Sequence, residues 1–331
     1  MPVLLVSHYC SAERGSDLAQ HAARAGVDIV TLPADGEARL PDDICARVDV
    51  AYFSTDVFPD YSRQFFSAVR KAPKLQWLHV FNVGVDHPVY TEMLQRGVRL
   101  TTSAGSTAEP IAQTAITALL MLARRFPRWL AAQRQHRWDP ARRNEDLPRD
   151  LRGQTAVIVG VGHIGKEIAR LARLLGLNVI GIRRSPLRPD DPVDELYAPE
   201  RLREVLARAD WLILACPLTA ETKGLVNADV IARLPQGAHL INIARGEIVD
   251  EAALLAALRS QHLGGAYLDV FHQEPLPADS PFWDMPNVYV TPHNSSAAVG
   301  NDQRVYKIFV ENLGRWSRSE PLLNEVHKTN P

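Results

Sequence analysis

A glycine-rich turn between a predicted strand and a predicted helix constrains this chain more than any other feature. The turn is Gly160-Val161-Gly162-His163-Ile164-Gly165, which follows the apolar run 155–159 and precedes the helix-period stretch 166–172. In such a unit the first glycine permits the tight turn, the second lets a pyrophosphate approach the backbone, and the third lets helix and strand pack closely. The free N–H groups at the helix start then face the phosphate charge. We therefore expect a dinucleotide site built by Gly160, Gly162, His163, Ile164 and Gly165.

The end of the next predicted strand indicates which dinucleotide binds. Enzymes that use NAD usually place an acidic residue there, about 20 residues on, for the ribose 2′-hydroxyl. Here the strand 178–182 is followed by Arg183, Arg184 and Ser185, and no carboxylate stands at its end. A guanidinium group matches phosphate geometry in a bidentate way, so we expect a 2′-phosphate contact and a preference for NADP(H). The alternative is a solvated arginine pair on a loop, with NAD(H) bound as well.

Composition limits the class of protein. The chain has 331 residues with 46% hydrophobic and 23% charged residues, which is ordinary for a globular protein of two domains. A net charge of −1 supplies no field for nucleic acid or an anionic membrane. The three cysteines Cys10, Cys45 and Cys216 lack metal-ligand spacing and form no even disulfide framework. The first residues lack the pattern of a signal peptide, and no apolar run is long enough to span a bilayer. We expect a cytoplasmic enzyme without metal, membrane or nucleic-acid partners.

Two series of alternating strands and helices predict an α/β fold. The first series has predicted strands at 3–6, 28–31, 50–54, 75–81 and 99–102, and the second has them near 155–159, 178–182, 211–215, 239–243, 265–268 and 288–290. This alternation favours parallel sheets. We expect two Rossmann-like or flavodoxin-like domains that face each other across a cleft. Residues 1–102 with 294–331 would form the substrate-binding domain, and residues 103–293 would form the NAD(P)-binding domain.

The region between the two series predicts self-association. A long helix over 109–125 is apolar over most of its circumference, and a loop rich in Arg, Asp and Pro follows at 134–150. Such a helix is buried inside a domain or against another subunit. Together with the loop near Trp138, it leads us to expect a homodimer.

Polar residues follow three predicted strands of the second series. Arg245, Glu274 and His293 each come after an apolar run. Reduction of a 2-oxo acid needs these residue types: an arginine binds the carboxylate, and a histidine gives a proton to the ketone oxygen. A carboxylate on the other ring nitrogen orients the histidine and favours its charged form. Each residue alone is more often a surface or turn residue, but the three together after the glycine turn favour a catalytic set.

The order of these motifs resembles the D-isomer-specific 2-hydroxyacid dehydrogenase family over nearly the whole chain. The resemblance implies Arg245 as carboxylate anchor and carbonyl polariser, Glu274 as the partner of the histidine, and His293 as general acid/base. Glu274 also separates this chain from the formate dehydrogenase branch, which carries Gln there. The resemblance further implies that Asp269 contacts the nicotinamide carboxamide and that Ile243 and Ala244 pack beside the nicotinamide. On the adenosine side of the cofactor, it implies a lining of Cys216, Pro217 and Thr222.

The segment Asn82-Val83-Gly84-Val85-Asp86 resembles the family's substrate loop. There, backbone N–H groups near Val83 and Gly84 would receive the substrate carboxylate, because fixed backbone donors suit an anion. The alternative is an ordinary glycine turn after a strand.

We therefore expect an NAD(P)-dependent D-2-hydroxyacid dehydrogenase. The leading hypothesis is an NADPH-preferring reductase of a small 2-oxoacid such as glyoxylate or hydroxypyruvate. One alternative is an NAD-dependent dehydrogenase of a bulkier D-2-hydroxy acid or of phosphoglycerate. An alternative of another class is a corepressor-like protein that senses the cofactor.

Overall fold

The computed structural model describes residues 1–85, 87–141 and 147–326, and these form two compact units. The first unit comprises Met1–Ser106 and Ala298–Pro331, and the second comprises Thr107–Ala297. Asp86 of the expected substrate loop and residues 142–146 of the expected loop at 134–150 lie outside the described residues. The function expected for each unit, and the cleft expected between them, stay predictions.

The first unit is built on a five-stranded parallel sheet in the order β2-β1-β3-β4-β5. Its strands are β1 (Val3–Val6), β2 (Asp28–Thr31), β3 (Val48–Phe53), β4 (Trp77–Val80) and β5 (Arg99–Thr102). Its helices are α1 (His8–Ala25), α2 (Asp42–Cys45), α3 (Ser62–Arg70), α4 (Pro88–Gln95) and α11 (Asn301–Ser317).

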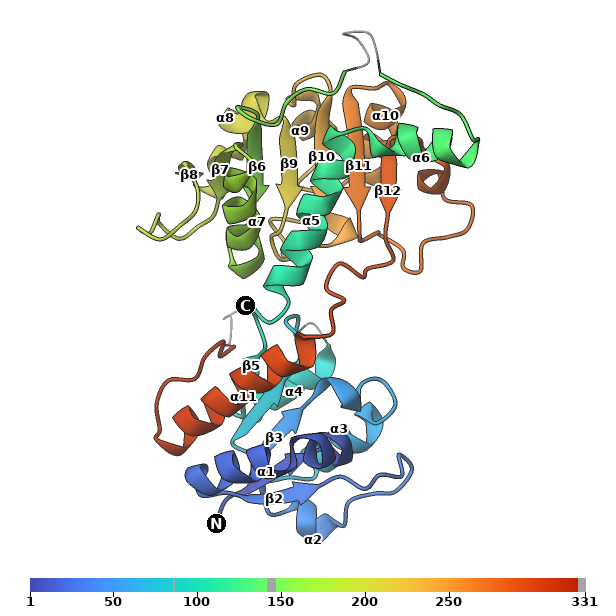
Figure 1. Ribbon diagram of the computed structural model, residues 1–331. Helices are drawn as coiled ribbons and strands as arrows, with labels where there is room; N and C mark the ends of the chain where they lie inside the picture. The colour runs from blue at the N-terminus through green and yellow to red at the C-terminus, as the bar shows by residue number, and fades with distance from the viewer. Residues whose placement is uncertain (86, 142–146, 327–331) are drawn as a thin grey trace. The chain divides into compact units, whose positions relative to one another are not determined.

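Helices cover both faces of this sheet, so its central strands β1, β3 and β4 are buried on both sides, as is usual for parallel strands. On one face, α11 packs beside α1 although almost the whole chain separates them (Figure 1). The ring of Phe309 in α11 stacks on Tyr52 of β3 with centroids 4.0 Å apart. On the other face, Phe65 of α3 and Met93 of α4 are fully buried. The C-terminal helix therefore belongs to the core of the first unit.

The second unit is built on a seven-stranded parallel sheet in the order β12-β11-β10-β9-β6-β7-β8. Its strands are β6 (Thr155–Val159), β7 (Asn178–Ile182), β8 (Glu195–Tyr197), β9 (Trp211–Leu214), β10 (Ala238–Asn242), β11 (Leu263–Leu268) and β12 (Val288–Val290). Its helices are α5 (Ala108–Ala123), α6 (Phe126–Arg134), α7 (His163–Leu174), α8 (Leu202–Val205), α9 (Ala228–Ala232) and α10 (Glu251–Arg259).

Two hydrophobic layers cover the two faces of this sheet. Helices α5 and α7 lie over one face, where Leu119 and Ile168 pack against Ile158 and Ile213 (Figure 1). Helices α8, α9 and α10 contribute to the other layer. The central strands β6, β9 and β10 are thus buried on both sides, and the loops at their ends are held on a rigid base. In the described part of the chain, no helix combines the length and apolar character needed to cross a membrane.

The expected fold class, two parallel-sheet α/β domains, is confirmed. Strand β8 was not expected, because three half-buried edge residues are too few to show a period. The sequence pattern predicts a helix over 17–25, whereas α1 begins at His8. The pattern misses this start because the first two turns carry almost no apolar stripe and Gly15 interrupts them with a φ of 29°.

Candidate active site

The candidate residues of the second unit lie at one edge of its sheet. Arg245 follows β10, Asp269 follows β11, His293 follows β12, and the glycine turn follows β6. All these strands run parallel in one sheet, with β9 between β10 and β6, so their carboxyl ends lie at the same edge. In open α/β sheets this edge is where ligands bind.

His293 and Glu274 form a hydrogen-bonded pair. The distance from His293 Nδ1 to Glu274 Oε2 is 2.7 Å, and the side chains are 48% and 37% exposed. The other carboxylate oxygen, Glu274 Oε1, accepts a hydrogen bond from the backbone N–H of Phe271 at 3.0 Å. A carboxylate only accepts, so Nδ1 carries the proton of this bond and Nε2 remains as the nitrogen that exchanges a proton with a ligand.

A buried carboxylate holds the turn that carries His293. The side chain of Asp269 is fully buried and accepts hydrogen bonds from Thr291 Oγ1 at 2.6 Å and from the backbone N–H groups of Asn294 and Ser295 at 2.8 and 3.1 Å. The backbone oxygen of Asp269 accepts from the N–H of His293 at 2.8 Å. These bonds keep His293 in the left-handed region, with a φ of 51°, which a non-glycine residue adopts only when its surroundings impose it. The expected contact of Asp269 with a carboxamide stays a prediction.

Asn242 shapes the turn that carries Arg245. Its side chain accepts a hydrogen bond from the N–H of Ala244 at 3.0 Å and donates one to the oxygen of Arg245 at 3.0 Å. The next residue is Gly246, where a Cβ would lie 2.0 Å from the backbone of Phe271. The loops after β10 and β11 therefore pack directly on each other, which brings the Arg245 turn beside the segment of Glu274. The guanidinium of Arg245 donates a hydrogen bond to the backbone oxygen of Ala244 at 2.7 Å.

The glycine turn has the steric features of a dinucleotide cradle. Gly160 has a φ of 99°, and a Cβ there would lie 2.6 Å from the backbone N of Cys216. A Cβ at Gly165 would lie 1.9 Å from the oxygen of Gly160, so α7 packs against the turn itself. Among the residues that the structure describes, a Cβ at Gly162 would meet no atom within 4 Å, and no side chain caps the start of α7 at His163. Open space beside uncapped N–H groups fits a pyrophosphate.

The expected 2′-phosphate ligands differ in their surroundings. Arg183 is nearly buried and forms an ion pair at 2.5 Å with Asp191, whose side chain is fully buried. Arg184 is 70% exposed and lies 3.4 Å from Glu221. Ser185 is exposed, and its backbone oxygen accepts a hydrogen bond from the guanidinium of Arg183. Sequence reasoning missed Asp191 because it stands eight positions after Arg183, not at the end of the strand.

The remaining expected cofactor residues are mostly buried. Burial raises the pKa of the Cys216 thiol to about 11, so the thiol stays neutral at physiological pH. The hydroxyl of Thr222 donates to the oxygen of Pro217 at 2.7 Å and accepts from the N–H of Thr219 at 2.7 Å, so it closes its own turn. Ile243 and Ala244 are 6% and 7% exposed. Their roles toward a cofactor stay predictions.

The expected substrate loop lies in the first unit, after β4. The side chain of Asn82 donates to the oxygen of Gly84 at 2.6 Å and accepts from the hydroxyl of Tyr90 at 3.0 Å, which fixes the loop on α4. Within the described residues, the backbone N–H groups of Val83 and Gly84 donate no hydrogen bond. Two such donors on a restrained loop suit an anion.

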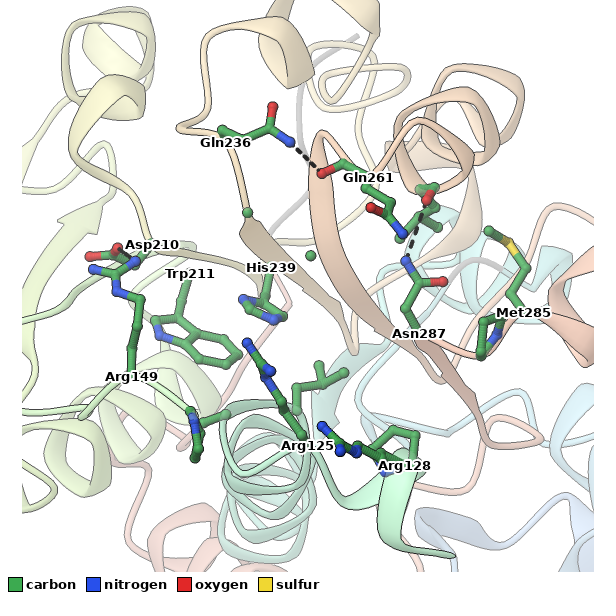
Figure 2. Close-up of a pocket in the computed structure, with 18 of the residues that line it drawn as sticks. Arg125, Arg128, Arg149, Asp210, Trp211, Gln236, His239, Gln261, Met285 and Asn287 are labelled. Carbon is green, nitrogen blue, oxygen red and sulfur yellow. Dashed lines mark hydrogen bonds and ion pairs between the residues drawn. The ribbon is translucent and has the colours of Figure 1, made fainter. Parts of the chain in front are cut away.

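The second unit has a cavity of about 920 Å³ at the edge of its sheet opposite to Arg245, Glu274 and His293. It is lined by residues at the amino ends of the strands, among them Gln154, Trp211, His239 and Asn287. Figure 2 shows Trp211 and His239 side by side in this cavity, with ring centroids 4.4 Å apart. None of Arg245, Glu274 or His293 lines it, so this cavity is separate from the candidate catalytic residues.

Comparison with known proteins decides the family. The sequence profile described as "D-isomer specific 2-hydroxyacid dehydrogenase, NAD binding domain" matches residues 116–295. The chain belongs to this family. Proteins of the D-isomer specific 2-hydroxyacid dehydrogenase family are NAD(P)-dependent oxidoreductases, so the expectation of an NAD(P)-dependent enzyme is confirmed.

Individual relatives cover most of the chain. A glyoxylate reductase of Korarchaeum cryptofilum is 35% identical over 261 residues, which are 78% of this chain and 77% of the relative. A family member from Xanthobacter autotrophicus Py2, solved in complex with NADPH and MES, is 32% identical with a TM-score of 0.75 over 98% of each chain. An NADPH-dependent glyoxylate/hydroxypyruvate reductase from Sinorhizobium meliloti, solved with NADP and sulfate, is 29% identical with a TM-score of 0.74 over 98% of each chain. Other similar proteins bear the names (S)-sulfolactate dehydrogenase and D-3-phosphoglycerate dehydrogenase.

Proposed function

We propose that this member of the family is an NADPH-preferring reductase that converts a small 2-oxo acid, such as glyoxylate or hydroxypyruvate, to the D-2-hydroxy acid. The observation that carries the proposal is the His293–Glu274 pair at 2.7 Å, at the strand edge that also carries Arg245 and the glycine cradle. An oriented histidine beside an arginine suits a reaction that adds a proton to the carbonyl oxygen of an anionic substrate.

Each residue of this set has a distinct task. The reduced nicotinamide, when bound, supplies the hydride that the carbonyl carbon receives. Arg245 binds the substrate carboxylate and stabilises the negative charge that grows on the carbonyl oxygen. The N–H groups of Val83 and Gly84 bind the same carboxylate. His293 donates the proton on Nε2 to the carbonyl oxygen, while Glu274 keeps the ring oriented through Nδ1.

Two observations support NADPH over NADH. The end of β7 carries Arg183, Arg184 and Ser185 where an NAD enzyme usually has a carboxylate for the ribose. The similar enzymes from Xanthobacter autotrophicus and Sinorhizobium meliloti were solved with NADPH and with NADP. The names of the relatives support glyoxylate or hydroxypyruvate as substrate. A second candidate function, oxidation of a bulkier or phosphorylated D-2-hydroxy acid with NAD, is favoured by the D-3-phosphoglycerate dehydrogenases among the relatives.

Initial rates with glyoxylate, hydroxypyruvate, pyruvate and phosphohydroxypyruvate, each with NADPH and with NADH, test the proposal. We expect the highest kcat/KM for glyoxylate or hydroxypyruvate with NADPH. Oxidation of D-3-phosphoglycerate with NAD as the fastest reaction would support the second function. Cofactor binding without turnover of any 2-oxo acid would instead point to a sensor protein and overturn the proposal.

A further inference from the structure

We propose that the two adjacent arginines after β7 have different tasks: Arg184 contacts the 2′-phosphate of the cofactor, and Arg183, held by Asp191, is a positioning residue that shapes the segment carrying Arg184. The inference rests on the proposed preference for NADPH. The sequence alone predicts that both arginines contact the 2′-phosphate, whereas the inference gives this contact to Arg184 only.

The guanidinium of Arg183 has no donor left for a phosphate. A guanidinium carries five N–H groups, and five acceptors surround this one. Two are the oxygens of Asp191, at 3.1 and 2.5 Å. The other three are the backbone oxygens of Ser185 at 3.1 Å, Val161 at 3.2 Å and Pro186 at 2.6 Å. The side chain is only 12% exposed. A phosphate would therefore have to displace bonds that the fold already makes.

Asp191 joins three segments around this arginine. Besides Arg183, its carboxylate accepts from the backbone N–H of Arg188 at 2.8 Å and pairs with Lys166 Nζ at 2.6 Å. Lys166 lies in the first turn of α7, directly after the glycine cradle. The hydrogen bonds from Arg183 and Lys166 hold the pKa of the Asp191 carboxyl well below its usual range. Removing Arg183 from this cluster would leave a buried carboxylate with one cation fewer, which is costly.

Arg184 has the opposite character. It is 70% exposed, and its ion-pair partner Glu221 is equally exposed at 3.4 Å. Exposed ion pairs of this kind contribute little to stability. A phosphate group carries more charge than the carboxylate of Glu221 and accepts a bidentate hydrogen bond from a guanidinium. Arg184 is therefore able to exchange Glu221 for a 2′-phosphate without disturbing the core of the unit.

Two small ligands isolate the 2′-phosphate from the rest of the cofactor: adenosine 2′,5′-bisphosphate and AMP. Their dissociation constants, measured by titration calorimetry on the full chain, give a preference ratio that does not depend on catalysis. The variants are Arg184→Gln, Arg183→Gln and Asp191→Asn. Arg259→Gln serves as the matched control, because this exposed arginine borders the cavity at the opposite edge of the sheet.

We expect Arg184→Gln to lower the preference for the bisphosphate by about ten- to hundredfold, the value of a charge-assisted contact, without lowering the melting temperature. Arg183→Gln should weaken binding of both ligands by similar factors and lower the melting temperature. Asp191→Asn should likewise lower the melting temperature and weaken binding of both ligands by similar factors, because the segment that carries Arg184 loses the carboxylate that holds Arg183. Arg259→Gln should change neither value.

One outcome would overturn the inference while the proposed function stands: a wild-type preference that survives in Arg184→Gln, whether or not it is lost in Arg183→Gln. Equal binding of the two ligands by the wild-type protein would instead refute the proposed NADPH preference, and the inference with it. Because Arg184 is exposed, we expect Arg184→Gln to fold. This variant therefore tests the inference even if Arg183→Gln does not fold.

Discussion

His293 is restrained through both its main chain and its ring. Asp269 holds the backbone of the turn, where His293 has a φ of 51°, and Glu274 holds Nδ1 at 2.7 Å. Such double restraint lowers the cost of placing the ring at the moment of proton transfer. It also separates orientation from chemistry, because Glu274 contacts Nδ1 and leaves Nε2, the nitrogen proposed to exchange the proton.

Replacement of His293 by alanine should therefore remove the proton donor and lower kcat by about 10²–10⁴, the usual contribution of a positioned acid. Glu274→Gln should retain more activity, because glutamine still accepts a hydrogen bond from Nδ1. Steady-state kinetics with NADPH and the best 2-oxo acid measure both effects. Near-normal turnover of His293→Ala with every 2-oxo acid would show that another group supplies the proton.

In the segment of β6, the glycine turn and α7, the space around each glycine determines what that glycine does. A Cβ at Gly165 would lie 1.9 Å from the oxygen of Gly160, whereas a Cβ at Gly162 would face open space. The two glycines are thus needed for different reasons, one for packing of the helix and one for approach of a ligand.

Gly165→Ala should force α7 away from the turn, lower the melting temperature strongly and abolish dinucleotide binding. Gly162→Ala should keep the wild-type melting temperature and still weaken dinucleotide binding, because the methyl group occupies the space open to the pyrophosphate. Circular dichroism and the fluorescence of bound NADPH measure the two properties. Equal melting temperatures for the two variants would contradict this separation.

At the scale of the whole molecule, two buried histidines predict how stability depends on pH. Burial lowers the pKa of His79 in the first unit to about 3 and that of His239 in the second to about 4, from an ordinary value of 6.5. In the unfolded chain both bind a proton below about pH 6.5, while the folded protein keeps them neutral. Stability is therefore complete above that pH and falls as the pH drops from 6.5 toward 4, by about 1.4 kcal/mol per pH unit for each histidine.

Denaturant unfolding at pH 7 and pH 5 measures this loss. The variant His239→Phe keeps an aromatic ring beside Trp211 but does not titrate, so the second unit should lose less stability over the same interval. A wild-type protein equally stable at pH 7 and pH 5 would show that these histidines stay accessible to protons.

Exposed apolar residues around α6 support the expected homodimer. Phe126 and Leu130, four positions apart on α6, are 42% and 36% exposed, and Trp138 shortly after the helix is 90% exposed. Exposed apolar surface can mark association sites in soluble proteins. Light scattering should give twice the chain mass at micromolar concentration, and Trp138→Ala should weaken association more than the control Trp283→Ala. A monomer at that concentration would contradict the prediction.

The sequence by itself determined the fold class, the glycine cradle and the residue types of the candidate site. Apolar periodicity and the steric demands of a glycine turn are local properties, so the strands from Thr155 to Val290 other than β8, and the turn at Gly160, were predictable. The order of Arg245, Glu274 and His293 after successive strands also follows from the chain, because parallel strands end at one edge.

Only the tertiary structure decided which polar groups the fold itself uses. Asp191, which follows Arg183 after a loop, accepts hydrogen bonds from the Arg183 guanidinium. Asp269 accepts hydrogen bonds from the backbone of the segment that carries His293. Short strands such as β8 and the polar start of α1 were missed for a related reason, since they are set by neighbours in space. Hydrogen-bond partners and the pairing of edge strands depend on where loops lie after folding. A local pattern of residues does not determine those positions.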